Sequence, residues 1–100
     1  MPEYEIVPKP REANEDALGL ILDDIERYAG WLGRGTSPKR VRSDVKELRT
    51  LVGGDYSEFQ DGVQLLIVDI GELSNSATRE LLQKRAHLLS KTASRVESIP

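Results

Sequence analysis

The sequence predicts an all-α protein, a small four-helix bundle with up-down-up-down topology and an extended N-terminal arm. Three observations predict this fold. Apolar residues recur with helical spacing in four separate segments. Capping residues or glycines bound these segments, and the connections between them are short, which makes consecutive helices antiparallel neighbours. With 100 residues, the chain has the size of one domain with one hydrophobic core.

Residues 1–13 are expected to form the arm, and residues 14–100 a single four-helix domain. Pro2, Pro8 and Pro10 each push the preceding residue toward extended geometry. The first helix is predicted over about residues 15–32, with Asn14 as N-cap and a glycine-rich exit. Its apolar face comprises Leu18, Ile21, Leu22, Ile25, Tyr28, Ala29 and Leu32.

The second helix is predicted over residues 38–52, because Ser37 suits the N-cap and Pro38 the first helical position. The fourth is predicted over residues 77–97, with Ser76 as its cap. The apolar face of the second helix comprises Val41, Val45, Leu48 and Val52, with Leu51 at its edge. That of the fourth comprises Leu82, Ala86, Leu89, Ala93 and Val96.

The third helix, predicted over residues 56–73, is the most apolar. Asp55 can cap it, with Glu58 completing a capping box. Its core face comprises Phe59, Val63, Leu66, Ile67, Ile70 and Leu73. Leu65 and Val68 fall on the opposite face, so this helix is central to a core or pressed against a second molecule. The alternative is a β-strand over residues 63–70, which would need the arm as its hydrogen-bonding partner.

The charges alternate in sign along the chain. Residues 1–33 carry a net charge of −5, residues 34–52 +4, residues 53–76 −5 and residues 77–100 +3. In an up-down-up-down bundle every neighbouring pair of helices then has opposite charge, and like charges occupy the diagonals. Each exposed ion pair contributes little, roughly 0–1 kcal/mol, but the pattern disfavours the wrong neighbours.

Composition excludes several kinds of site. The chain has no cysteine and one histidine, which excludes disulfides, thiolate metal sites and His-rich metal sites. No catalytic or cofactor-binding motif is present, so we expect neither enzyme activity nor a cofactor. No apolar run approaches the roughly 20 residues that span a membrane. The acidic, proline-interrupted N-terminus does not resemble a signal peptide, so a cytoplasmic location is expected.

Four apolar residues are predicted on outward faces: Leu20 and Trp31 in the first helix, and Leu65 and Val68 in the third. Apolar groups at such positions indicate contact with another molecule. The leading hypothesis is therefore a non-enzymatic protein-interaction module, such as a small regulator, inhibitor, immunity-type or adaptor protein. Because two-fold dimers are the commonest oligomers, we expect a homodimer formed through the third helix.

The first alternative function is nucleic-acid binding through a basic flank of the second helix. Lys39, Arg42, Lys46 and Arg49 follow one another at helical spacing. A basic helix face is a common way to contact phosphates. The same flank could instead face an acidic neighbouring helix, which is the favoured interpretation, or an acidic protein partner.

The second alternative involves His87, between Lys84 and Lys91 on the polar side of the fourth helix. Residues 86–93 are similar to the phosphoacceptor helix of histidine phosphotransfer domains, which are also four-helix bundles. The resemblance implies an exposed histidine that accepts a phosphoryl group, with a nearby lysine to screen it. The family has lysine three residues and glycine four residues after that histidine, where this chain has Ser90 and Lys91. A surface histidine without such a role is the favoured interpretation.

Overall fold

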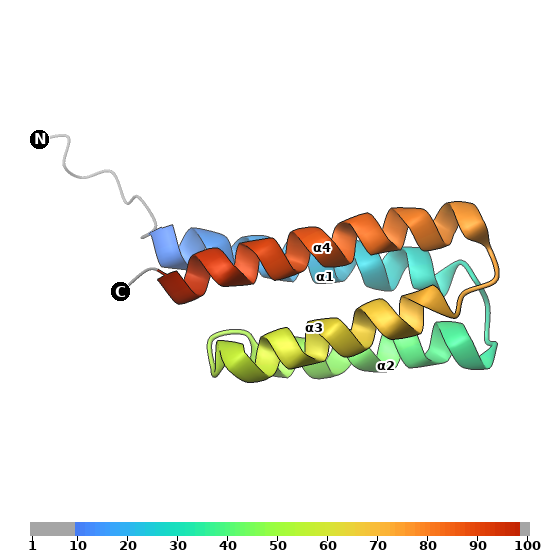
Figure 1. Cartoon of the computed structure of the whole chain (residues 1–100), viewed down its shortest axis with the longest axis horizontal. Helices are drawn as coiled ribbons and strands as arrows, with labels where there is room; N and C mark the ends of the chain where they lie inside the picture. Colours follow the sequence, from blue (N-terminus) through green and yellow to red (C-terminus); the bar gives the residue numbers. More distant parts are fainter. Residues whose placement is uncertain (1–9, 99–100) are drawn as a thin grey trace, which may run out of the picture.

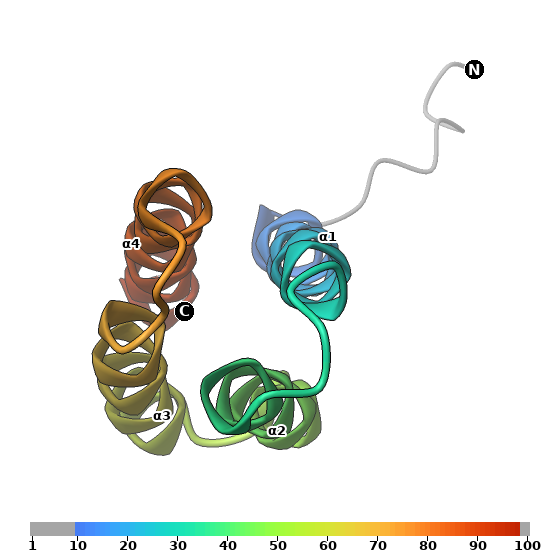
Figure 2. The same cartoon turned by 90° about the vertical axis from the view of Figure 1, so that its right-hand side faces the viewer.

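A computed structural model describes residues 10–98 and confirms the all-α four-helix bundle (Figure 1). Its helices are α1 (Pro10–Gly30), α2 (Thr36–Leu51), α3 (Tyr56–Gly71) and α4 (Ser76–Ser98). Contacts join α1 to α2, α2 to α3, α3 to α4 and α4 to α1, so that α1 and α3 lie on a diagonal (Figure 2). The up-down-up-down topology is confirmed. The alternative strand over residues 63–70 is wrong, because this segment lies within α3.

The four predicted apolar faces meet in one core. The buried members that helical spacing predicted are Leu18, Ile21, Leu22, Ile25, Ala29, Val41, Val45, Leu48, Phe59, Val63, Leu66, Ile70, Leu73, Leu82, Ala86, Leu89, Ala93 and Val96. Tyr28, Leu32, Leu51, Val52 and Ile67 are partly buried against it. Burial of such side chains stabilises the fold by about 1.5–3 kcal/mol each for the larger ones, so this core holds the four helices together.

The first helix begins earlier than predicted, at Pro10. Proline suits the first turn of a helix, where the backbone N–H that it lacks has no partner. Arg11 Nη1 donates a hydrogen bond of 3.2 Å to the carbonyl of Val96, which ties this turn to the end of α4. Residues 10–13 therefore belong to the helix, and Asn14 lies inside it instead of capping it. The rest of the predicted arm, residues 1–9, lies outside the described residues.

The other helix starts show one confirmed cap and two corrections. Asp55 caps α3, since its Oδ1 accepts a 2.8 Å hydrogen bond from the Ser57 amide. The N-cap of α2 is Gly35, which has no side chain to offer, and the predicted Ser37 lies inside the helix. The cap of α4 is provided by Asn75, whose Oδ1 accepts from the Thr78 amide at 2.9 Å, and not by Ser76.

Two helices end about two residues earlier than predicted. After α1 ends at Gly30, the Leu32 amide donates to the Ala29 carbonyl at 3.1 Å. After α3 ends at Gly71, the Leu73 amide donates to the Ile70 carbonyl at 3.0 Å. These bonds span three residues instead of four, which is how a helix tightens at its C-terminus. Apolar periodicity continues through such a turn and so extends the predicted helix too far.

The start of α3 is held against α1 by Tyr56, which is buried. Its hydroxyl donates to Glu15 Oε2 at 2.8 Å and accepts from the Gly53 amide at 2.8 Å. Burial, the largest effect, raises the pKa of Tyr56 above its ordinary value, and the hydrogen bond to Glu15 raises it further. Gly53 has a positive φ of 86°, a conformation that favours glycine. The Tyr56 hydroxyl therefore links the α2–α3 connection and the start of α3 to α1.

Candidate protein-interaction groove

The two outward apolar residues of α3 are exposed and neighbour one another. Leu65 is 55% exposed and Val68 62% exposed, and they lie about one helical turn apart. Burying a side chain of this kind against a partner would stabilise the complex by about 1.5–3 kcal/mol. The outward position that the sequence predicted for Leu65 and Val68 is thus observed in the structure.

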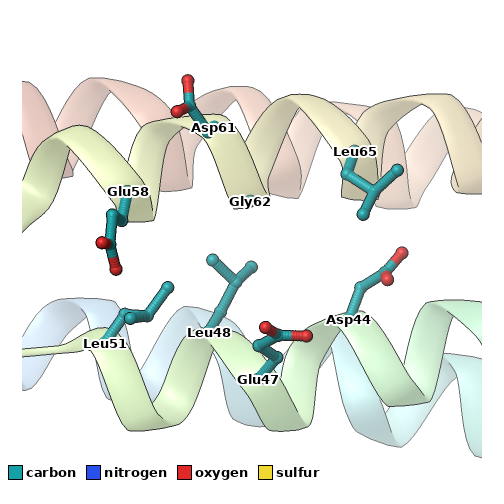
Figure 3. A pocket seen from close by; sticks show the side chains of 8 residues that line it. All are labelled: Asp44, Glu47, Leu48, Leu51, Glu58, Asp61, Gly62 and Leu65. Atoms are coloured by element: carbon teal, nitrogen blue, oxygen red, sulfur yellow. The ribbon is translucent and has the colours of Figure 1, made fainter.

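Leu65 also lines a groove between α2 and α3, with a volume of about 290 Å³ (Figure 3). The lining residues are Asp44, Glu47, Leu48 and Leu51 from α2, and Glu58, Asp61, Gly62 and Leu65 from α3. Each helix contributes positions i, i+3, i+4 and i+7, which share one helical face. The groove therefore runs along about two turns of each helix, or roughly 10 Å.

The groove has an apolar part formed where the two helices approach closely. Leu48 points from α2 toward Gly62 of α3 (Figure 3). A Cβ atom added to Gly62 would lie only 2.7 Å from Leu48 Cδ2, so a side chain at this position would require Leu48 to shift. Leu51 and Leu65 lie at opposite ends of the groove (Figure 3). Leu65 therefore belongs both to the groove and to the outer face of α3.

The remaining lining residues are all acidic, and none of the eight lining residues is basic. Glu47, Glu58 and Asp61 are exposed, whereas Asp44 is half-buried. Carboxylates that share a groove without a basic partner raise the negative potential there and attract cations. The groove between α2 and α3 is therefore acidic, although residues 34–52, which include α2, carry a net positive charge.

Asp44 is the half-buried member of the four acidic lining residues. Its Oδ2 atom is buried and has no hydrogen-bond donor among the described residues. Burial, the largest effect, together with hydrogen bonding to and repulsion by Asp69 of α3, raises the pKa of Asp44 from 3.8 to about 7. Repulsion by Glu47 acts in the same direction, and attraction by Arg40 opposes it. The α2–α3 interface therefore places two carboxyl groups, Asp44 and Asp69, near one another where opposite charges were predicted.

Leu20 of α1 and Trp31, which directly follows the last residue of α1, are exposed by 67% and 71%. Trp31 packs edge-on against the ring of Tyr28, with ring centroids 5.1 Å apart. An ion pair of 3.3 Å between Asp24 and Arg27 lies between Leu20 and Trp31 along the chain. Because α1 is diagonal to α3, these two residues do not join the groove. Isolated exposed apolar residues of this kind are ordinary on protein surfaces.

The basic flank of α2 is largely turned toward α1. Arg49 Nη2 lies 2.6 Å from Asp23 Oδ1 and 2.8 Å from Glu26 Oε1. Its hydrogen bond to Glu26, followed by the effects of Asp23, raises the pKa of Arg49 despite partial burial. Arg42 Nη1 donates to the carbonyls of Ala29 at 3.2 Å and Gly33 at 3.0 Å. The favoured interpretation of this flank was contact with an acidic neighbouring helix. Arg49 makes this contact with two carboxylates of α1, whereas Arg42 contacts backbone carbonyls at the end of α1 and in the turn that follows.

The other two members of the basic flank, Lys39 and Lys46, are exposed. With Arg34, Arg42 and Ser43 they line a shallow hollow on the side of α2 away from the groove. No aromatic ring lines this hollow for base stacking. Nucleic-acid binding through these residues stays a prediction.

His87 lies exposed on α4, and the flanking Lys84 and Lys91 are exposed too. Their placement agrees with the predicted polar face of the helix. Phosphotransfer at His87 stays a prediction as well.

Among the residues that the structure describes, no three acidic or histidine side chains are grouped so as to hold a metal ion. Within the same range, no helix is both long and apolar enough to cross a bilayer.

Comparison with models of known protein families found no match, and searches of curated proteins and of solved structures found none either.

The acidic side of the groove was missed in the sequence, which indicated only Leu65 from its lining. A signal was present: the acidic pairs Asp44–Glu47 and Glu58–Asp61 each precede a leucine at helical spacing. Which flank of each helix faces the other depends on the rotation of both helices about their axes. That rotation is set by packing of the whole core.

Proposed function

We propose that this chain is a non-enzymatic protein-interaction module that binds another protein through the outer face of α3 and the adjoining α2–α3 groove. The observation that carries the proposal is that Leu65, which lies exposed beside Val68 on the outer face of α3, also lines the groove. Connected apolar surface of this kind marks interaction sites, whereas single exposed residues do not. Small regulators, inhibitors, immunity-type proteins and adaptors all act through such surfaces.

Self-association through α3 is one form of this proposal. A two-fold pair centred on the groove would bring the carboxylates of Glu47, Glu58 and Asp61 against the same groups of the second copy. Like charges placed face to face across an interface cost free energy, so this arrangement is disfavoured. A symmetric pair would therefore be centred on Val68, away from the acidic rim.

Site-specific photo-crosslinking in the native host tests the proposal. Val68→p-benzoylphenylalanine places the crosslinker on the proposed surface, at a position exposed enough to accept it. Glu80→p-benzoylphenylalanine, at an exposed position of α4, is the control. We expect a defined protein adduct from position 68 that disappears when Leu65→Ser is added, and none from position 80. An adduct of twice the chain mass would identify a homodimer.

The proposal is contradicted if position 68 yields no adduct, or yields the same adducts as position 80. It is contradicted equally if Leu65→Ser leaves the adduct unchanged. Circular dichroism of the purified variants shows whether each keeps its helical content, so loss of the fold is distinguished from loss of the partner.

A further inference from the structure

We infer that the α2–α3 groove binds a short, basic, amphipathic helix of a partner protein. This inference rests on the proposed function and adds the chemistry of the partner. It follows from the sign of the charge in the groove, from the shape of the groove, and from the poor charge match of the occupants considered from this chain.

The charge of the groove requires a basic ligand. Glu47, Glu58 and Asp61 are exposed at its rim, and no lining residue is basic. The basic residues Arg42 and Arg49 of α2 are directed to α1 and do not neutralise the rim. Lysine or arginine side chains flanking an apolar ridge would meet these carboxylates and would leave the apolar part to the ridge itself. Complementary charges of this kind determine which partner binds.

The shape of the groove favours a helix over an extended peptide. A groove between two antiparallel helices receives the ridge of side chains of a third helix. Extended segments bind chiefly by adding to an exposed strand edge or by docking on aromatic rings; the described residues contain no strand, and no aromatic residue lines the groove. The two turns lined by Asp44–Leu51 and Glu58–Leu65 match apolar anchors at i, i+4 and i+7 of a bound helix.

Two candidate occupants from this chain are disfavoured by charge. In its first nine residues the acidic side chains of Glu3 and Glu5 outnumber the single lysine, Lys9, so this segment lacks the basic flanks that the rim would attract. A second copy docked groove to groove would oppose carboxylate to carboxylate. A basic helix from a different protein is the occupant that the charges select.

A pair of synthetic peptides tests this inference on the full chain. Both peptides form amphipathic helices of about four turns with leucines at i, i+4 and i+7. One carries lysine on its flanks, and the other carries glutamate at the same positions. Fluorescence anisotropy measures affinity, and amide chemical shifts in NMR spectra locate the site. We expect the basic peptide to bind at least about tenfold more tightly than the acidic one, with the largest shifts at Leu51, Gly62 and Leu65.

Charge-reversed variants separate the rim from the net charge of the protein. The rim variant combines Glu47→Lys with Asp61→Lys, and the control combines Glu80→Lys with Glu97→Lys on α4. All four positions are exposed, and both double variants change the net charge equally. We expect the rim variant to bind the basic peptide at least about tenfold more weakly, and the control to stay within about twofold of the unmodified chain.

Each other result overturns the inference in a recognisable way. Equal binding of both peptides in the groove would remove the charge requirement but keep the proposed function. Equal weakening by both double variants would show attraction to the net charge alone. If neither peptide shifts the groove residues while the position-68 crosslink still forms, the inference is wrong and the proposed function stands. If that crosslink is absent too, both are wrong.

Discussion

The two flanks of α2 meet their neighbours in opposite ways. Toward α1, Arg49 lies 2.6 Å from Asp23 and 2.8 Å from Glu26, and Arg42 satisfies two backbone carbonyls. Toward α3, Asp44 has a buried oxygen without a donor, and the groove is lined by carboxylates and leucines. The α1–α2 interface is bridged by charged groups with partners, whereas the α2–α3 interface has a groove that is open to solvent.

This difference shows that the net charge of a helix does not predict the charge of each of its surfaces. Successive residues turn by about 100° around a helix, so the positive and negative groups of α2 separate onto different flanks. The ion pairs found between helices within residues 10–98 join α1 to α2 and to α4, where Arg85 Nε lies 4.0 Å from Asp24. Alternation of net charge thus agrees with the contacts of α1 but not with the contact between α2 and α3.

Asp44, at the α2–α3 interface, should make stability depend on pH. Burial and Asp69 raise the pKa of Asp44 from 3.8 to about 7, so the folded protein binds this proton more tightly than the unfolded chain does. The contribution of Asp44 to stability is therefore fully present below about pH 4. It is lost as the pH rises through about 7.

Asp44→Asn should remove this dependence, because asparagine cannot ionise. At pH 8 we expect the variant to be more stable than the unmodified chain by about 1.5 kcal/mol, a value reduced from the full pKa shift because solvent screens a half-buried group. At about pH 4 the two should be equally stable. Urea unfolding at both pH values measures the difference. Asp61→Asn, an exposed residue of the same groove, is the control, and equal pH dependence of both variants would contradict the assignment.

The close approach of the same two helices predicts a difference between two glycines. A Cβ atom at Gly62 would lie 2.7 Å from Leu48 Cδ2, whereas nothing lies within 4 Å of one at Gly19 of α1. Gly19→Ala should stabilise the chain by about 1 kcal/mol through helix propensity. Gly62→Ala should lose this gain because the buried Leu48 must move. Thermal or urea unfolding measures both, and equal gains would show that α2 and α3 are further apart.

The smallest effect is expected at the α1–α2 interface. The Arg49 side chain is 36% exposed and that of Asp23 54%, so their ion pair is well screened by water. Arg49→Gln should lower the free energy of unfolding by about 0.5 kcal/mol at low salt, and by less in about 1 M NaCl. Lys46→Gln, which removes an exposed charge from the same helix, should have no measurable effect. A loss that persists at high salt would mean that Arg49 acts through packing.

The sequence predicted the existence, number and order of the helices because each has an apolar face with helical spacing. Their ends were predicted less well. The start of α1 depends in part on the bond from Arg11 to Val96, which is 85 residues away in the chain. The starts of α2 and α4 differ by one or two residues because caps contribute only about 1 kcal/mol and neighbouring serines, asparagines and glycines compete for them.

Of the candidate site, Leu65 and Val68 could be predicted, since their position opposite the core face of α3 follows from helical periodicity alone. The groove could not be predicted, because it exists only where Leu48 and Gly62 meet across two helices. Its acidic rim could not be predicted from segment charge either, since this requires the angle at which each helix faces the other.

The sequence by itself thus determined the four helices, their core faces and the exposed apolar residues of α3, because these depend on spacing within one helix. Only the tertiary structure decided that Arg49 faces α1 while Asp44 faces Asp69. The physical reason is that burial of the apolar faces dominates the free energy of folding. The rotation of each helix about its axis is therefore set by the packing of the core, and this rotation determines which neighbour each charged flank faces.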